Sequence, residues 1–457
     1  MQNVQQKFSF RYACATAIVL MTLLLAILDG TIANVALPVI ARELHADAAF
    51  SVWITGAYQL VMVASMLPFA SLAERVGYRR VFLAGLGIFT VSSILCAYSN
   101  AMPVLIAARG VQGLGMAATM SVCTAFIRLL VPGAQLGRAM AWKSVAAAAA
   151  AASGPSLAAI MLEVGSWHWL FAFNIPLGIL AMAGGYLTLP ESKRRDSRFD
   201  NLGALLNVVV LVLFVMALHH VGAEGRQSTV LLQTAAALVV GYIHVRRQIK
   251  QSTPLLPLDL LRNRLFSKAV CLTVKSSVAQ MLMVVSLPFL MHEMLTLSQY
   301  QIGLVMSTLS LTIVVLAPVA GVLSDRYCNT ALSSLGLLVL ACGLLLLAIR
   351  GTDCGPYQIA WRVAICGIGL SLFRTPNART ILISAPVERG AGASSISTMA
   401  AISGQACGTT VAGLIFHHAS HGGPVTALYV AAFVALLASG VSALGRFGNE
   451  RPLHPAV

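Results

Sequence analysis

The stretch "LLLAILDGTIANVALP", residues 23–38, is an apolar run that contains a single acidic residue, Asp29. It belongs to a span of about 20 apolar residues, which as a helix crosses the ~30 Å hydrocarbon core of a bilayer. Similar runs recur along the chain of 457 residues, of which 58% are hydrophobic and 10% charged. Soluble domains carry about 25% charged residues, so this composition indicates a polytopic membrane protein.

About fourteen runs are long enough to span a membrane. They lie near 14–37, 51–72, 81–99, 104–127, 139–162, 169–189, 202–220, 228–245, 269–291, 301–324, 331–349, 357–374, 394–416 and 424–445. The first run is too long for a cleavable signal and lacks a small-residue cleavage pattern, so we expect it to stay as the first span. The sequence predicts an all-α polytopic membrane protein.

The basic charge of the chain follows the expected topology. Alternate loops, counted from the N-terminus, hold 24 of the 30 Lys and Arg residues, and the opposite loops hold three. Arg374, at the end of the run 357–374, is counted with the first set. This asymmetry is the positive-inside pattern, and it predicts that both termini are cytoplasmic. The net charge of +15 is therefore read as a topology signal, and no nucleic-acid partner is expected.

A weak internal repeat indicates two related halves. "LAER" at 72–75 recurs as "LSDR" at 323–326, and "SG" at 153–154 recurs at 403–404. The two offsets are nearly equal, as in a parallel repeat of six-span halves. Arg109 with Gly113 and Gly115 has a looser echo in Arg362, Gly367 and Gly369.

The repeat leads to a prediction of three parts. These are an N-terminal six-helix bundle at 1–190, two inserted transmembrane helices with a cytoplasmic linker at 191–265, and a C-terminal six-helix bundle at 266–457. In transporters built from repeats, the binding sites lie between the repeats near the middle of the membrane. Polar residues inside spans are therefore the first candidates for function.

Asp29 lies on a stripe of small and polar residues along an otherwise leucine-rich helix. Helical spacing places four residues within about 60° of it: Thr22, Ala26, Ala33 and Ala36. Such a stripe faces protein or a cavity rather than lipid. Two readings stay open: a carboxylate that carries a proton or a cation, or a structural carboxylate held by a neighbouring donor.

Arg109 lies about 9 Å deep from the outer side, in the same half of the membrane as Asp29. An unpaired arginine there costs at least about 2.5–3.5 kcal/mol, so a pairing between Arg109 and Asp29 is predicted. The pair is either part of proton coupling or purely architectural. Lys275 lies near the midplane and either faces a cavity or extends its ammonium toward the cytoplasm. Further substrate-cavity candidates are Asn34, Gln112 and Asn377.

The connection "LAERVGYRRVF", residues 72–82, combines charges with a turn. Glu74 and Arg75 end one helix, Gly77 allows the turn, and Arg79 opens the next helix. These charges either set topology or form a conformational switch, and Asp325 and Arg326 occupy the matching positions in the second half. In the run 139–162, Gly154 and Pro155 predict a local kink, because proline removes a helical hydrogen bond.

Together these stretches resemble the major facilitator superfamily, and within it the fourteen-span drug:proton antiporter branch. The resemblance covers nearly the whole chain. It rests on "LDGTIANVALP" from Leu28, "WITGAYQL" from Trp53, "LAERVGYRR" from Leu72, "RGVQGLGMAA" from Arg109, "SGPSLAA" from Ser153, "WHWLFAFNIPLG" from Trp167 and "PLLPLDLLRNRLFS" from Pro254. The family's span-5 motif ends in paired glycines, where this chain has Ala158 and Ala159; alanine keeps close packing but loses backbone freedom.

The resemblance implies the major facilitator fold and a monomeric, proton-coupled exporter in the cytoplasmic (inner) membrane of a bacterium. Substrates would be amphipathic or cationic small molecules moved by alternating access, with Asp29 and Arg109 in proton coupling. The proton-motive force would drive transport, with no cofactor and no metal. The alternatives are a transporter of metabolites or organic anions anchored by Lys275, a membrane-embedded enzyme, and a sensor. An enzyme would need a convergent cluster of chemical groups, which the sequence does not offer.

Overall fold

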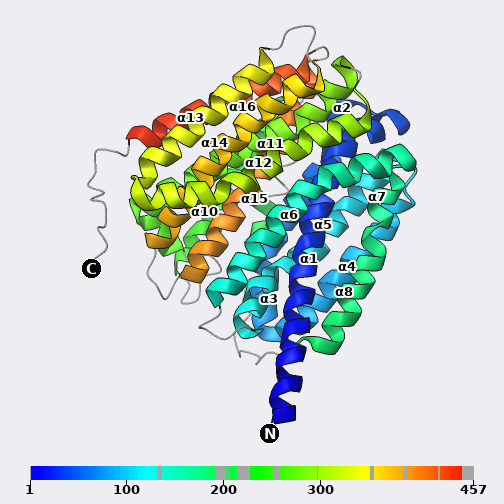
Figure 1. The fold of residues 1–457 in the computed structure, drawn as a ribbon, viewed down its shortest axis with the longest axis vertical. Coiled ribbons are helices and arrows are strands. Elements are labelled where there is room, and N and C mark those ends of the chain that lie inside the picture. The colour runs from blue at the N-terminus through cyan, green and yellow to red at the C-terminus, as the bar shows by residue number, and fades with distance from the viewer. Residues whose placement is uncertain are drawn as a thin grey trace. The chain divides into compact units, whose positions relative to one another are not determined.

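The computed structural model describes residues 2–130, 136–191, 202–203, 205–210, 213, 227–250, 258–295, 297–349, 355–384, 390–419 and 422–444. All regular structure in these ranges is helical (Figure 1). The chain divides into two compact units, Met1–Leu255 and Leu256–Val457, called here the N-terminal and C-terminal units. The described part of 202–213 and one further helix follow the first six expected spans within the N-terminal unit.

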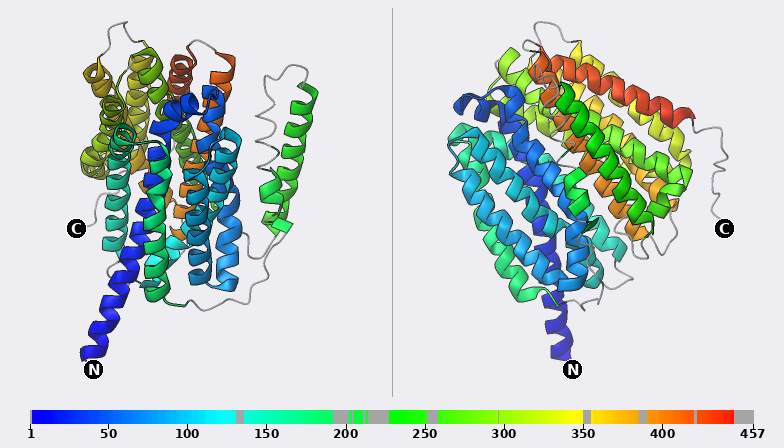
Figure 2. Two further views of the ribbon diagram at one scale, coloured as in Figure 1. Left: turned by 90° about the vertical axis from the view of Figure 1, so that its right-hand side faces the viewer. Right: turned by 180° about the vertical axis from the view of Figure 1, so that it is seen from behind.

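In the N-terminal unit the helices are α1 (Gln2–Glu43), α2 (Ala48–Ser51), α3 (Trp53–Val76), α4 (Tyr78–Ala97), α5 (Met102–Leu130), α6 (Leu136–Val164), α7 (His168–Ala172), α8 (Asn174–Thr188) and α10 (Gln227–Lys250). The first turns of α1 extend beyond the neighbouring ends of α4 and α8 (Figures 1 and 2). In the C-terminal unit they are η2 (Leu258–Arg262), α11 (Arg264–Phe289), η3 (Leu290–Met294), α12 (Gln299–Arg326), α13 (Asn329–Ala348), α14 (Pro356–Ile383), α15 (Gly390–His418) and α16 (Gly423–Leu444).

Thirteen of the fourteen expected spans overlap described helices. The run at 202–220 falls partly outside the described residues, as does the last residue of the run at 424–445. Ten helical stretches among the described residues are long and apolar enough to cross a membrane, and α6 and α10 contain shorter apolar stretches. The fold is therefore that of an all-α polytopic membrane protein. Some helices extend well beyond the apolar runs: α1 begins twelve residues before position 14, at Gln2, and α14 continues nine residues beyond position 374, to Ile383.

Local sequence explains where several helices begin and end. Gly77 is the only residue between α3 and α4, and its φ of 107° is a conformation that glycine adopts without strain. Asn263 caps α11 by accepting hydrogen bonds from the backbone N–H groups of Leu265 and Phe266. Ser298 starts α12 with a capping box completed by Gln301.

The same kind of close helix contact at glycine occurs in both units, as the internal repeat of the sequence predicts. A side chain at Gly85 of α4 would meet the carbonyl oxygen of Gly115 in α5 at 2.7 Å. In the C-terminal unit a side chain at Gly336 of α13 would meet the carbonyl oxygen of Gly369 in α14, also at 2.7 Å. Each glycine thus permits a backbone approach that any larger residue would prevent, and the two units use it between equivalent helices.

A second pair of glycine contacts, one within each unit, shows which residues of α1 correspond to which residues of α11. Gly154 of α6 packs against Thr31 of α1, and Gly404 of α15 packs against Val274 and Ser277 of α11. This register pairs Asp29 in the first unit with Lys275 in the second, because Thr31 corresponds to Ser277. The carboxylate of the first unit therefore has a cation as its counterpart.

Candidate functional site

Asp29 of α1 and Arg109 of α5 form a buried ion pair. The Nη1 atom of Arg109 lies 2.7 Å from Oδ2 of Asp29, and the side chains are 0% and 1% exposed. Helices α1 and α5 pack against each other, so residues eighty positions apart meet inside the unit. The pairing predicted from their depths in the membrane is present.

Two amides complete the surroundings of the carboxylate. Asn174, the first residue of α8, donates from Nδ2 to Oδ1 of Asp29 at 2.7 Å. Gln112 of α5 donates to the same oxygen at 3.4 Å and to the hydroxyl of Ser93 at 2.8 Å. Three donors therefore converge on the carboxylate, which is what a buried ionised acid requires.

The guanidinium of Arg109 is held from several sides. Its Nη1 also donates to Oε1 of Gln112 at 2.5 Å, and its Nε donates to the backbone carbonyl of Ile54 at 3.3 Å. The Cζ atom lies 4.3 Å from the ring centroid of Tyr58 and 5.5 Å from that of Phe171, as in cation–π contacts. Two buried atoms of this cluster, Nη2 of Arg109 and Oδ1 of Asn174, have no hydrogen-bond partner among the described residues. The site therefore keeps one spare donor and one spare acceptor next to Asp29.

Asn174 is the member of this cluster that sequence reasoning missed. It lies inside "WHWLFAFNIPLG", which carries the family resemblance, but nothing in the local pattern connects it with α1. Gln112, expected as a cavity residue, is fully buried in the cluster instead of lining an open surface. The spacing in the sequence is consistent with this position, because Gln112 follows Arg109 by three residues and so lies on the same face of α5.

The other expected cavity residues lie apart from this cluster. Asn34 is buried on α1, where it donates to the carbonyl of Gly30 and accepts from the hydroxyl of Thr55 at 3.1 Å. Asn377 is buried on α14 and donates to α11, at the carbonyl of Ala269 and the hydroxyl of Thr273. Both side chains therefore connect neighbouring helices within their units.

Lys275 is partly exposed on α11 and makes no hydrogen bond or ion pair with the residues that the structure describes. It lies seven positions after Lys268, so the two share a face of α11. The Nζ atom of Lys268 donates to the carbonyl of Ser442 in α16 at 2.8 Å. Lys275 thus occupies the side of α11 toward α16, whereas Ala269 and Thr273 mark the side toward α14.

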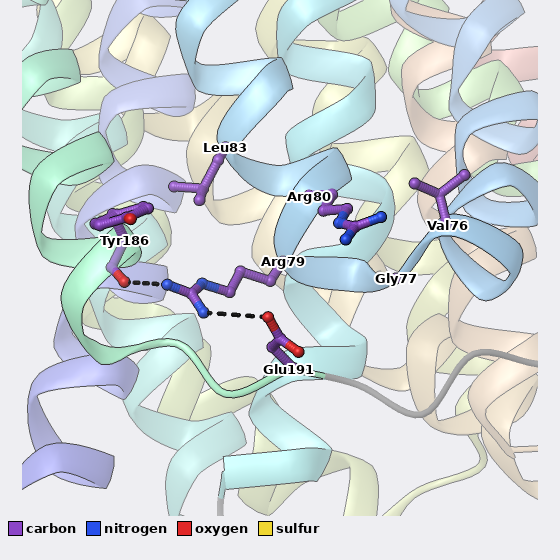
Figure 3. Close-up of a pocket in the computed structure, with 7 residues that line it drawn as sticks. All are labelled: Val76, Gly77, Arg79, Arg80, Leu83, Tyr186 and Glu191. Carbon is purple, nitrogen blue, oxygen red and sulfur yellow. Dashed lines mark hydrogen bonds and ion pairs between the residues drawn. The ribbon is translucent and has the colours of Figure 1, made fainter.

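The connection between α3 and α4 forms a small basic pocket (Figure 3). Arg79 donates to the backbone carbonyl of Tyr186 in α8 and lies 3.8 Å from Oε1 of Glu191. Its guanidinium also stacks over the ring of Tyr186, whereas Arg80 points away from both partners in Figure 3. Arg79 thereby links the start of α4 to the end of α8.

Glu74 and Arg75, at the end of α3, are exposed. In the C-terminal unit, Asp325 pairs with Arg379 of α14, which also donates to the carbonyl of Ser324 at 2.9 Å. Arg326 is exposed at the last position of α12. Glu74 and Asp325, the acids of the two related loops, thus differ in their surroundings. The loop sequence did not indicate Arg379 as the partner of Asp325.

Gly154 and Pro155 lie inside α6, which runs continuously from Leu136 to Val164. A side chain at Gly154 would collide with Thr31, so glycine is needed for the close approach of α6 to α1. Ala158 and Ala159 are buried further along α6. The kink expected at Pro155 stays a prediction.

Comparison with known proteins places this site in a family. The model of the Major Facilitator Superfamily matches residues 19–274 and 269–456. The chain is 41% identical over 437 residues to the uncharacterized transporter YebQ of Escherichia coli K12, covering 95% of each chain. It is 30% identical to the riboflavin transporter RibZ of Clostridioides difficile, covering 81% of each. It is also 30% identical to the multidrug resistance protein Stp of Mycobacterium tuberculosis, covering 86% of this chain and 74% of the relative.

Solved structures share the fold. A POT family transporter crystallised with 5-aminolevulinic acid superposes with a TM-score of 0.73 and 15% identity, covering 94% of this chain and 95% of the other. Paired helical units with a buried carboxylate–arginine site, together with these matches, define a multi-pass membrane transporter of small molecules. The chain belongs to the Major Facilitator Superfamily.

Proposed function

We propose that this transporter is a proton-coupled exporter of amphipathic small molecules, of the fourteen-span drug:proton antiporter branch, working as a monomer in a bacterial inner membrane with both termini cytoplasmic. Transport would use the proton-motive force and no cofactor. The observation that carries the proposal is the buried cluster of Asp29, Arg109, Asn174 and Gln112. The multidrug resistance protein Stp, named for resistance, supports export.

The cluster can hold Asp29 in either protonation state. When Asp29 is ionised, the donors that contact it in the structure, Arg109 and the two amides, would neutralise and solvate it. When it takes up a proton, its hydroxyl needs an acceptor, and the spare Oδ1 of Asn174 lies on the same amide. A half-turn of that amide would exchange its donor for its acceptor. Protonation would also remove the charge that attracts Arg109, so the helix contact between α1 and α5 would weaken.

This difference between the two states supplies what coupling needs. A proton can drive a conformational change only if it stabilises one conformation more than the other. The ion pair of Asp29 and Arg109 links α1 to α5, so its strength changes with protonation and with any movement of these helices. The position in the second unit that corresponds to Asp29 is Lys275, which is not a carboxylic acid. We therefore propose that Asp29 is the single carboxyl group that carries the coupled proton.

The test is substrate-dependent proton movement in proteoliposomes that carry a pH-sensitive dye. Ethidium, riboflavin and 2-naphthoate would be added in turn under an imposed pH gradient. We expect at least one compound to stimulate proton flux through the native protein. The flux should be absent with Asp29→Asn and with the charge-free pair Asp29→Asn/Arg109→Gln, and retained in part with Asp29→Glu, which keeps a titrating group. Flux at the native rate through Asp29→Asn, or no response to any compound, would overturn the proposal.

A second candidate, transport of organic anions, is favoured by the cations of the C-terminal unit. The described helices from α11 to α16 contain two acidic residues: Asp325 at the end of α12, and Glu293 in η3, which directly follows α11. The same helices carry Lys275 and Arg374 within their lengths.

A further inference from the structure

Arg374 is a charged residue that the sequence placed in a loop and the structure places inside a helix. It lies nine residues before the end of α14 at Ile383, which is about 14 Å along the helix axis. Its side chain is accessible to solvent although protein atoms surround it. A charged side chain within a helix of a membrane protein is expected to face protein, a water-filled cavity or a ligand rather than lipid.

The contacts between α11 and α14 show which way Arg374 points. Asn263, just before α11, donates to the carbonyl of Ser384, and Asn377 donates to Ala269 and Thr273. This antiparallel register sets the backbone of Arg374 near residue 274 of α11. Its Nη2, however, donates to Oε1 of Gln280 at 2.5 Å, six residues or about 9 Å further along α11. The side chain therefore points away from the nearer end of its helix, opposite to a snorkelling arginine.

Gln280 and Arg374 together present only hydrogen-bond donors. A guanidinium has no acceptor, so the glutamine must turn its oxygen toward Arg374 and its NH₂ group away. One of the five N–H donors of Arg374 is used by Gln280 in the described structure. Helices α11, α13, α14, α15 and α16 contain no acidic residue within their described lengths. Asp325, at the end of α12, is paired with Arg379, and Glu293 lies in η3, thirteen residues beyond Gln280.

We propose that Arg374, oriented by Gln280, binds the anionic oxygen group of a transported molecule, a carboxylate or a phosphate. The planar fork of arginine fits both groups with two parallel hydrogen bonds. Of the two substrate classes that the sequence leaves open, this site selects amphipathic anions over cations. The inference deepens the proposed function and rests on it for the direction of transport, but the binding step needs no proton gradient.

The experiment measures binding by the full-length protein in nanodiscs of phosphatidylcholine, with two matched pairs of probes. These pairs are 2-naphthoate with 2-naphthamide, and riboflavin 5′-phosphate with riboflavin. We expect the native protein to bind the anionic member of at least one pair about tenfold or more tightly than its neutral partner. Because no gradient is present, this result does not depend on whether Asp29 couples protons.

Three variants assign the preference to the site. Arg374→Gln should abolish it, and Arg374→Lys should keep part of it. Gln280→Glu should also abolish it while Arg374 remains, because the new carboxylate would occupy the guanidinium; this variant keeps the side-chain size and forms an ion pair, so it should fold. The control is Arg362→Gln, which removes another arginine of α14 and should leave the preference unchanged.

Several results would overturn the proposal. The native protein could bind neither anion, show no preference, or keep its preference in Arg374→Gln. The phosphate group of an anionic lipid could also bind to Arg374. If phosphatidylglycerol in the nanodisc displaces the probes from the native protein, and binds Arg374→Gln more weakly, the site belongs to a lipid headgroup and not to a substrate.

Discussion

Arg109 and Asp29 lie 2.7 Å apart with both side chains excluded from the surface. Each residue alone would be expensive in this position, and together they form the centre of a hydrogen-bonded cluster. Breaking a buried ion pair from one side leaves an uncompensated charge, which costs about 3–5 kcal/mol. Removing both charges costs much less, because no unpaired ion stays behind.

The first prediction uses this non-additivity. Arg109→Gln strands the carboxylate, and Asp29→Asn strands the guanidinium, so each should lower the thermal stability of the purified protein. The double variant Asp29→Asn/Arg109→Gln should recover most of the loss but not coupled transport. Fluorescence-detected thermal unfolding in detergent measures this cycle. Losses that simply add in the double variant would show that the two charges do not interact energetically.

The second prediction concerns Asn174, which donates to Asp29 from the start of α8. Asn174→Leu removes both the donor and the spare acceptor, so it should reduce proton flux strongly and shift its pH dependence. Asn174→Gln keeps an amide and should retain more flux. The control is Asn34→Leu, which alters a buried amide of α1 that does not bond to Asp29. An unchanged pH profile in Asn174→Leu would leave Asn174 a purely structural residue.

The third prediction tests close packing between α3 and α5. A side chain at Gly113 would collide with the backbone carbonyl of Tyr58, while Gly110, one turn earlier, has its nearest neighbour at 3.8 Å. Gly113→Ala should therefore destabilise the protein by about 1–3 kcal/mol. Gly110→Ala should be neutral or slightly stabilising, because alanine is the better helix former. Equal stability of the two variants, measured by thermal unfolding, would contradict the packing described here.

The fourth prediction concerns the segment after α8, which the sequence predicts to lie between two six-helix bundles. Asn207 donates from Nδ2 to the carbonyl of Ala64 in α3 at 2.6 Å, so it attaches this segment to the N-terminal unit. Asn207→Leu should lower the amount of folded protein in the membrane without changing which compounds are transported. Val208→Ala, at the neighbouring exposed position, is the control. Altered compound selectivity at normal expression would place Asn207 on the transport route.

The predicted membrane topology can be tested at Ser197, which lies outside the described residues. A cysteine introduced there should resist an impermeant thiol reagent added to intact cells, because the basic loop at 191–200 is expected to be cytoplasmic.

The positions of the helices could be read from the sequence because lipid imposes a simple requirement. Backbone groups in a membrane must be bonded within the segment, so each long apolar run becomes a helix, and glycine or charge marks its end. Gly77 shows this, since the only residue between α3 and α4 is the glycine that the turn needs. The depth and cost of Asp29 and Arg109 were enough to predict that they pair.

Tertiary structure alone decided which other side chains meet them. Asn174 reaches Asp29 because α8 packs against α1, and helical periodicity carries no information about which distant helix becomes a neighbour. The same holds for Arg374, because a hydropathy boundary cannot show that α14 continues as a helix beyond the apolar run. Its guanidinium points toward Gln280 because helical side chains lean toward the N-terminus of their own helix, and α11 and α14 run in opposite directions. Sequence thus determined the spans and the charged pair, and helix packing determined the hydrogen bonds that make them a site.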